Sequence, residues 1–325
     1  MNRRRRTYLV LIAIGVALAL VALRGLWQPV QRAVIDRETA LPNDIAKRGP
    51  TTDRHPPILH SSEFEQPVPL PYPINTAGGE DSPFILPDGN TLYFFFTPDV
   101  RVPHSEQLSD GVTGIYVARR VGDAWGKPTR VWLCEPDKLT LDGAPYVRGD
   151  EMWFASARQG YAGLNMFTAR QVDGEWREIR YAGEQLMKQF EIGEVHLHGD
   201  QLFFHSRRAG GKGDYDIWVT TRDGTGWTEP VSIDAINTGA VEGWPFVSSD
   251  GTELWFTRVH LGTPAVFRSE LIGGVWGAPE LIVSQFAGEP TLDAAGSLIF
   301  VHHFYEDGVM IEVDLYVAAR KSQTR

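Results

Sequence analysis

A repeat of 49 to 51 residues runs through most of this sequence and limits the folds open to it. A tryptophan stands nine residues after each of the first four repeat centres. Independent segments would not keep this register, so the chain is predicted to contain copies of one structural unit packed side by side. The repeat centres are GIYVAR at Tyr116, NMFTAR at Phe167, DIWVTT at Trp218, AVFRSE at Phe267 and DLYVAA at Tyr316.

Each repeat also contains a second strand rich in aromatic residues, such as NTLYFFF at 90–96 and TELWFTR at 252–258. Turn signals precede these strands, as in ProAspGly at 87–89 and SerAspGly at 249–251. Four strands and a turn-rich edge in about 50 residues describe one propeller blade. The composition agrees, because 33 Gly, 21 Pro and 11% aromatic residues suit many short strands joined by turns. The predicted fold class is all-β.

The last of the five repeats lacks the outer strand that carries the tryptophan. In three repeats a proline follows the tryptophan by three residues, and Phe64 and Pro67 show the same spacing ahead of the first repeat. A strand at this point would complete the last blade and leave no open sheet edge. The prediction is therefore a five-bladed β-propeller over residues 64–325, closed by an N-terminal strand.

Three segments of the repeat carry a family resemblance: SPFILPDGNTLYFFF, SRRAGGKGDYDIWVT and VSSDGTELWFTR. They resemble the PD40, or WD40-like, repeats of TolB-type periplasmic β-propellers and of repeat regions attached to OmpA-like envelope proteins. The resemblance covers about residues 64–320, although the second, third and fifth repeats replace SPDG by VRGD, LHGD and DAAG. It implies a propeller in the bacterial envelope but no single activity, since propellers host many functions.

The N-terminal 27 residues are predicted to be a signal anchor. Four arginines at 3–6 precede an uncharged apolar run, and a transmembrane helix is predicted at about residues 8–24. Because arginines stay on the cytoplasmic side, the prediction is a single-pass protein of the cytoplasmic membrane with its propeller on the outer, periplasmic or extracellular, side. A cleaved signal peptide is the alternative. Residues 28–63 contain five prolines and are predicted to form a Pro-rich tether.

Charge and motifs exclude several functions. Residues 64–325 carry 21 Lys and Arg against 36 Asp and Glu, and such an acidic body repels phosphate backbones, so no nucleic acid is expected as a partner. A single cysteine, Cys134, excludes an internal disulfide and a zinc site of the CxxC kind. No serine–histidine triad, phosphate-binding glycine loop or nucleotide fingerprint is present.

Acidic residues mark the start of each predicted innermost strand. Positions two residues apart share a strand face, so each blade is predicted to direct one carboxylate into the central channel. Asp81 has the opposite parity and is an alternative to its neighbour. The repeats are aligned on a proline or valine near the start of this strand. Glu80, Asp142 and Glu242 stand three residues before the aligned residue, and Glu194 and Glu289 stand one residue before it.

Cationic residues begin the loops that face these acids. One interpretation is a set of structural ion pairs that lock the blades together. The other is an acid-lined mouth that binds a small polar ligand, a carbohydrate or an envelope protein, with Trp244 stacking on a ring. The function predicted is a membrane-anchored extracytoplasmic propeller that acts as a ligand-binding or protein-interaction scaffold. Its ligand-binding residues would be Glu242, Glu289, Arg158, Arg207, Arg258, Trp244, His302 and His303.

An envelope glycoside hydrolase or related carbohydrate-active enzyme is the alternative function. Five-bladed glycosidases similar in outline place an Asp, an Asp and a Glu on their first three blades, and the catalytic candidates in that order are Glu80 or Asp81, Asp142 and Glu194. Their carboxylates would need to lie about 5 to 9.5 Å apart. No cofactor is expected, with a divalent cation at Glu194 and His196 left open because these residues share a strand face.

Overall fold

The structure is a computed structural model that describes residues 35–134, 138–183, 186 and 192–322. Strands make up nearly all of its regular structure. The helices labelled within these ranges are short: α2 covers Arg37–Ala40 and α3 covers His104–Gln107. The described part of the chain is therefore nearly all-β, as the sequence predicts.

The strands form antiparallel sheets that follow the repeats. The second repeat consists of β8 (Thr140–Arg148), β9 (Glu151–Arg158), β10 (Asn165–Val172) and β11 (Glu175–Tyr181). The third consists of β12 (Val195–His198), β13 (Gln201–Ser206), β14 (Asp216–Asp223), β15 (Gly226–Trp227) and β16 (Val231–Ser232). The fourth consists of β17 (Glu242–Val247), β18 (Glu253–His260), β19 (Thr263–Ile272), β20 (Val275–Trp276) and β21 (Glu280–Ser284), with β1 (Ile58–Leu59) at its edge.

The first and last repeats belong to one continuous sheet. The first contains β3 (Gly79–Ile85), β4 (Thr91–Thr97), β5 (Gly114–Val121), β6 (Ala124–Trp125) and β7 (Thr129–Arg130). The last contains β22 (Ala287–Leu292), β23 (Leu298–Glu306), β24 (Val309–Ala318) and β2 (Val68–Pro69). A single parallel bridge, Val313 to Gly79, joins the two repeats.

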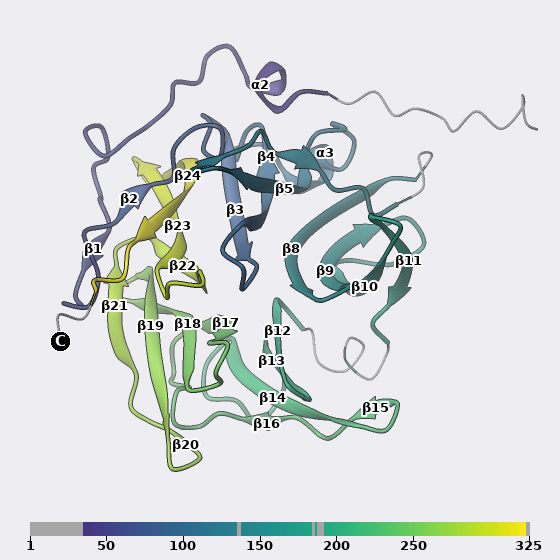
Figure 1. The fold of residues 1–325 in the computed structure, drawn as a ribbon, viewed down its shortest axis with the longest axis vertical. Coiled ribbons are helices and arrows are strands. Elements are labelled where there is room, and N and C mark those ends of the chain that lie inside the picture. Colours follow the sequence, from purple (N-terminus) through teal and green to yellow (C-terminus); the bar gives the residue numbers. More distant parts are fainter. Residues whose placement is uncertain (1–34, 135–137, 184–185, 187–191, 323–325) are drawn as a thin grey trace, which may run out of the picture. The chain divides into compact units, whose positions relative to one another are not determined.

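The first strand of each repeat lies innermost. β3 contacts β8, β8 contacts β12, β12 contacts β17, β17 contacts β22, and β22 contacts β3 again. These contacts close a cycle, and Figure 1 shows the five strands gathered around a common centre. This is the arrangement of a β-propeller.

The upstream segment supplies the outer strand of the last repeat. β2 pairs antiparallel with β24, Val68 opposite Val317, and Phe64 forms an isolated bridge with Arg320. The strand after Phe64 therefore lies in the sheet of the last repeat, as the spacing of Phe64 and Pro67 predicts.

Aromatic residues of neighbouring repeats pack edge to face between the sheets, which explains the regular spacing of the tryptophans. The Phe64 ring meets Trp255, so Phe64 takes the tryptophan's place in the last repeat. The ring centroids are 6.4 Å apart for Tyr93 and Trp176, 6.3 Å for Trp153 and Trp227, 6.4 Å for Phe203 and Trp276, and 6.0 Å for Phe64 and Trp255.

Four innermost strands contain a β-bulge. The pairing register shifts after Asp81 in β3, after Gly143 in β8, after Gly243 in β17 and after Gly288 in β22. Just beyond these points a non-glycine residue has a left-handed backbone, with φ of 46° at Ser82 and 52° at Glu289. A bulge inserts one extra residue, so residues on its two sides no longer follow one alternation of faces.

Residues 35–63, where the sequence predicts a tether, lie against the propeller. Arg37 is buried and bonded to Glu80, Lys47 forms ion pairs with Glu312 and Asp314 of β24, and β1 pairs with β21. Basic residues of this segment thus pair with buried acids of the sheets. We call residues 35–63 the strap.

The predicted transmembrane helix at about residues 8–24 lies outside the described residues. Within the described ranges, no helix is long and apolar enough to cross a membrane. A membrane-spanning helix needs about 20 apolar residues, whereas α2 and α3 have four each. The prediction of a single-pass location in the cytoplasmic membrane, with the propeller on its outer side, is corrected by this finding.

Candidate functional site

The bulges divide the predicted channel acids into two groups. The acids that precede a bulge are Glu80, Asp142 and Glu242, and each is fully buried beside an arginine. Arg37 Nη1 donates to Glu80 Oε1 at 3.1 Å, Arg158 Nη2 to Asp142 Oδ1 at 3.0 Å, and Arg258 Nε to Glu242 Oε1 at 2.7 Å. In the first, second and fourth repeats, the acid predicted to face the channel is thus held in a buried ion pair, and the bulge interrupts the alternation on which that prediction relied.

Each of these arginines also lies over aromatic rings of its sheet. The guanidinium carbon is 4.8 Å from the Phe96 centroid for Arg37, 4.2 Å from Phe167 for Arg158 and 4.6 Å from Phe267 for Arg258. Ion pairing and contact with an aromatic face stabilise a buried guanidinium together. This part of the acid ring therefore fits the interpretation as structural ion pairs.

A short motif, missed in the sequence reasoning, marks two of these acids. IleAsnThr occurs at 74–76 and at 236–238, with the threonine four residues before the acid. The Thr76 hydroxyl donates to Glu80 at 2.7 Å, and that of Thr238 donates to Glu242 at 2.5 Å. Asn237 bonds both the N–H and the C=O of Ile217, each at 2.8 Å. The motif could have identified these acids as structural.

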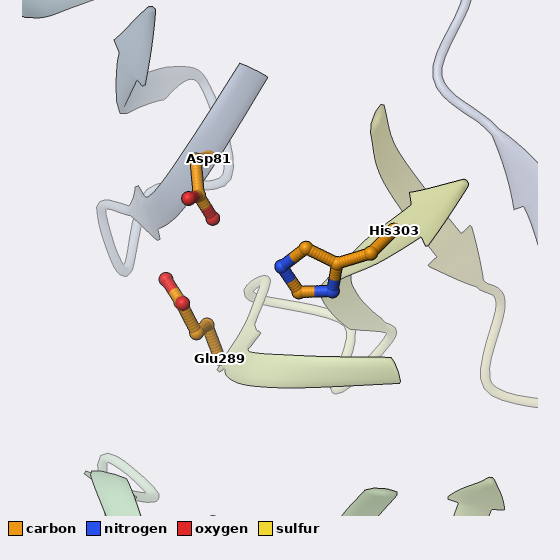
Figure 2. A group of neighbouring side chains, drawn as sticks. All are labelled: Asp81, Glu289 and His303. Atoms are coloured by element: carbon orange, nitrogen blue, oxygen red, sulfur yellow. The ribbon is translucent and has the colours of Figure 1, made fainter. Parts of the chain in front are cut away.

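Three side chains converge at the centre, and among the described residues no arginine or lysine forms an ion pair with them. One carboxylate oxygen each from Asp81 and Glu289, and one ring nitrogen of His303, all lie within 4.8 Å of one another. Figure 2 shows the two carboxylates and the imidazole turned toward a shared space. Glu194 lies close by, accepting a 3.2 Å hydrogen bond from the Ser82 hydroxyl. We call Asp81, Glu194, Glu289 and His303 the hub cluster.

The hub cluster contains residues of the first, third and last repeats. Asp81 lies on β3, Glu289 on β22 and His303 on β23, while Glu194 precedes β12. Asp81 takes the position that glycine occupies in the other repeats, at 143, 193, 243 and 288. In the sequence, Asp81 has the parity opposite to that of the predicted channel acids. The bulge that begins directly after Asp81 breaks the alternation of strand faces, so the Asp81 carboxylate still reaches the cluster.

The His303 ring is oriented by a backbone carbonyl. Its Nδ1 lies 3.3 Å from the Phe286 carbonyl oxygen, which can only accept, so Nδ1 carries the proton in this bond. The other nitrogen, Nε2, then keeps a free lone pair, and in Figure 2 the nitrogen remote from the side-chain attachment points at the carboxylates.

Burial and mutual repulsion shift the titration of this group. Burial raises the pKa of Glu194 to about 8, and the nearby Asp81 charge adds to the rise. Burial raises the pKa of Glu289 well above its usual value, helped by the charges of Asp81 and Glu194. Burial also lowers the pKa of His303. Like charges in a desolvated site cannot all ionise without a compensating cation.

A small cavity of ≈ 40 Å³ lies beside the cluster, lined by Ser82, Glu194, Trp244 and Glu289 among others. A larger cavity of ≈ 820 Å³, which we call the funnel, is lined by the turns between the first and second strands of the repeats. Both cavities share Phe84, Tyr146, His196 and Phe246, so these rings lie between them. We call these four residues the aromatic plug.

The remaining predicted site residues have other surroundings. His196 packs in the aromatic plug, 4.8 Å from Tyr146 and 4.7 Å from Phe246 between ring centroids, and burial lowers its pKa to about 3. The metal-ligand group found among the described residues thus contains His303 in place of His196. His302 is buried and bonded to Asp53 of the strap at 2.8 Å.

Arg207 and Trp244 belong neither to the buried arginine–acid pairs nor to the hub cluster. Arg207 forms an exposed pair with Asp214 at 3.1 Å. Trp244 lines the small cavity, and its ring centroid lies 4.9 Å from that of His205.

Comparison with known proteins supports the fold. No protein-family model matches the chain, and a search of curated proteins finds no match. The endo-arabinase from Bacteroides thetaiotaomicron is similar in structure, with a TM-score of 0.51 and 15% identity over 78% of this chain and 97% of its own.

Two further solved structures match this chain with lower TM-scores. A gluconolactonase from Xanthomonas campestris has a TM-score of 0.48 and 12% identity, covering 85% of this chain and 98% of its own. TolB from Acinetobacter baumannii has a TM-score of 0.44 and 13% identity, covering 88% and 66%. At 15% identity, the similarity to the endo-arabinase concerns the fold alone.

Proposed function

We propose that this protein is a five-bladed binding propeller, built from PD40-like repeats, whose hub cluster holds a small cationic ligand. Binding would then be the function of the acid-lined centre, and the arginine-paired acids around it would hold the blades in place. The strap would supply the cation that pairs with Glu80 of the first blade, and β2 would complete the last blade.

One observation carries this proposal: Glu289 Oε2 is buried and has no hydrogen-bond partner among the described residues. The neighbouring acids Glu80, Asp142 and Glu242 each have an arginine. Within the described ranges, none of the ion pairs includes Asp81, Glu194 or Glu289. A buried carboxylate without a counter-ion is costly, so this site favours a cation that comes from outside the chain.

The size of the cavity limits the ligand. A volume of ≈ 40 Å³ leaves room for an ion or the tip of a basic group. Pockets for drug-sized ligands measure about 300–1,000 Å³. A sugar ring would therefore need the side chains around Glu194 and Trp244 to move apart.

Thermal unfolding in the presence of small cations tests the proposal. Methylammonium, guanidinium, Ca²⁺ and Mn²⁺ chlorides, compared with NaCl at equal ionic strength, should include at least one that raises the Tm. At a concentration of 100 Kd the stabilisation would be about 2.7 kcal/mol. Asp81→Asn should abolish the effect, while Glu175→Gln, an exposed carboxylate, should leave it unchanged. Equal shifts in both variants, or none with any cation, would refute the proposal.

Glycoside hydrolysis is the second candidate, because Asp81 and Glu289 are close together and Glu194, with a pKa of about 8, keeps a proton at neutral pH. Retaining glycosidases use carboxylates about 5–5.5 Å apart and a protonated acid. Asp142, the remaining member of the predicted trio, is held by Arg158. Product analysis with arabinan, glucan and peptidoglycan fragments tests this candidate. Absence of turnover, or turnover that survives Glu194→Gln, would remove it.

A further inference from the structure

We propose that Asp81, Glu289 and His303 bind a first-row divalent metal ion, of which Mn²⁺ and Zn²⁺ are the representatives to test. This inference deepens the proposed function, on which it rests, by naming the chemical class of the cation. The ligand atoms would be one oxygen from each carboxylate and Nε2 of His303.

The spacing of these atoms suits one shared ion. Bonds from such a metal to carboxylate oxygen and imidazole nitrogen are about 2.0–2.2 Å long, so two ligands of one ion lie no more than about 4.4 Å apart. The three candidate atoms already lie within 4.8 Å of one another. Small rotations of the two carboxylates would bring them to bonding distance.

The imidazole is already in the form that a metal requires. A metal-bound histidine commonly donates its other ring N–H to a carbonyl or carboxylate, which fixes the tautomer and the ring orientation. Nδ1 of His303 faces the Phe286 carbonyl oxygen at 3.3 Å, and the backbone N–H of His303 donates to the same oxygen at 3.0 Å. Both contacts hold Nε2 toward the carboxylates.

Charge and donor type select the class of metal. Two carboxylates and one neutral imidazole carry two negative charges, which a divalent ion balances. Ca²⁺ and Mg²⁺ prefer sites built of oxygen ligands alone, whereas an imidazole favours first-row transition metals and zinc. The buried, unpartnered Oε2 of Glu289 supplies the observation that this group needs a ligand.

The three ligands also lie on both sides of the junction between the first and last repeats. Asp81 belongs to β3, and Glu289 and His303 belong to β22 and β23. A single parallel bridge joins the sheets of these repeats. A metal ion at this point would add a further link between them, so its binding should also oppose unfolding.

The test uses the full chain, stripped of metal with EDTA and dialysed. Titration with MnCl2 followed by electron paramagnetic resonance should show loss of the free Mn²⁺ signal at one equivalent, and ZnCl2 should displace the Mn²⁺. Asp81→Asn, Glu289→Gln and His303→Gln should each weaken binding at least tenfold. Glu175→Gln and His260→Gln, a carboxylate and an imidazole outside the cluster, should bind as the unaltered protein does.

Stability of the metal-free variants separates a ligand role from a structural one. Metal-free Asp81→Asn and Glu289→Gln should be as stable as the unaltered protein or more stable, because the first removes a repelling charge and the second replaces a carboxyl group whose raised pKa already favours its neutral form. The inference is overturned if no stoichiometric Mn²⁺ or Zn²⁺ binding occurs, or if binding survives in all three variants. If methylammonium or guanidinium stabilises the protein while the metals do not, the inference fails and the proposed function stands. If no cation acts, both fail.

Discussion

The ion pair between the strap and β3 gives a sharp test of how the propeller is held together. Arg37 and Glu80 are 6% and 0% exposed, and their charged atoms are 3.1 Å apart. Arg37→Met keeps an apolar chain of similar length over Phe96 but leaves Glu80 buried without its cation. Breaking one side of a buried pair costs about 3–5 kcal/mol, because the remaining charge stays desolvated.

Urea unfolding followed by tryptophan fluorescence measures this loss. Arg101→Met is the matched control, since Arg101 and Asp99 form a 2.8 Å pair with an exposed arginine, and it should cost about 0–1 kcal/mol. The double variant Arg37→Met with Glu80→Gln should recover part of the stability, because no buried charge remains. If Arg37→Met costs no more than Arg101→Met, then the strap does not stabilise the propeller and the reasoning is wrong.

Further predictions concern charge, hydrogen bonding and packing. Lys47→Met should destabilise the protein more at pH 8 than at pH 5, because burial raises the pKa of Glu312 and of Asp314 even beside Lys47 and the loss of Lys47 raises their folded-state pKa values further. The stability of the variant therefore falls as the pH rises from the unfolded-state pKa values toward the folded-state values. Equal shifts of the urea midpoint at both pH values would contradict this. Asn237→Ala should cost about 1–3 kcal/mol, since it leaves the buried N–H of Ile217 unpaired while the Ile217 C=O keeps its bond from the Ile233 N–H. Asn165→Ala, which removes solvent-exposed hydrogen bonds, should cost less in the same assay. Gly193→Ala should cost about 1–3 kcal/mol or more, because the added Cβ would lie 1.7 Å from His205 Nε2. Gly49→Ala, whose added Cβ would have nothing within 4 Å, should be neutral. Similar Tm values for the two variants would refute the packing argument.

The regular part of the fold can be predicted from the sequence because identical packing roles recur at a fixed interval. Trp176, Trp227 and Trp276 meet aromatic rings on the second strands of neighbouring sheets, and Phe64 takes the same place against Trp255. These contacts depend on residue type and spacing, both of which are visible in the sequence. The packing interpretation of Trp176 and Trp227 is therefore confirmed.

The site is less predictable, because its geometry depends on the bulges. A left-handed backbone at Ser82 and Glu289 is not encoded by glycine, so counting alternate residues assigns Asp81 to the wrong face. Arg37 is also unpredictable from its surroundings, since its partner Glu80 is 43 residues away and belongs to another element. β9 and β18 contain the arginines that pair with the acids of their repeats, whereas β4 contains no arginine. This difference indicates that the first repeat takes its cation from another segment.

The aromatic plug couples the two cavities on the axis of this propeller. Phe84, Tyr146, His196 and Phe246 line the small cavity and the funnel alike, and their rings pack against one another with centroids 4.7 to 6.3 Å apart. A substitution of any one of these rings therefore changes the shape of both cavities at once.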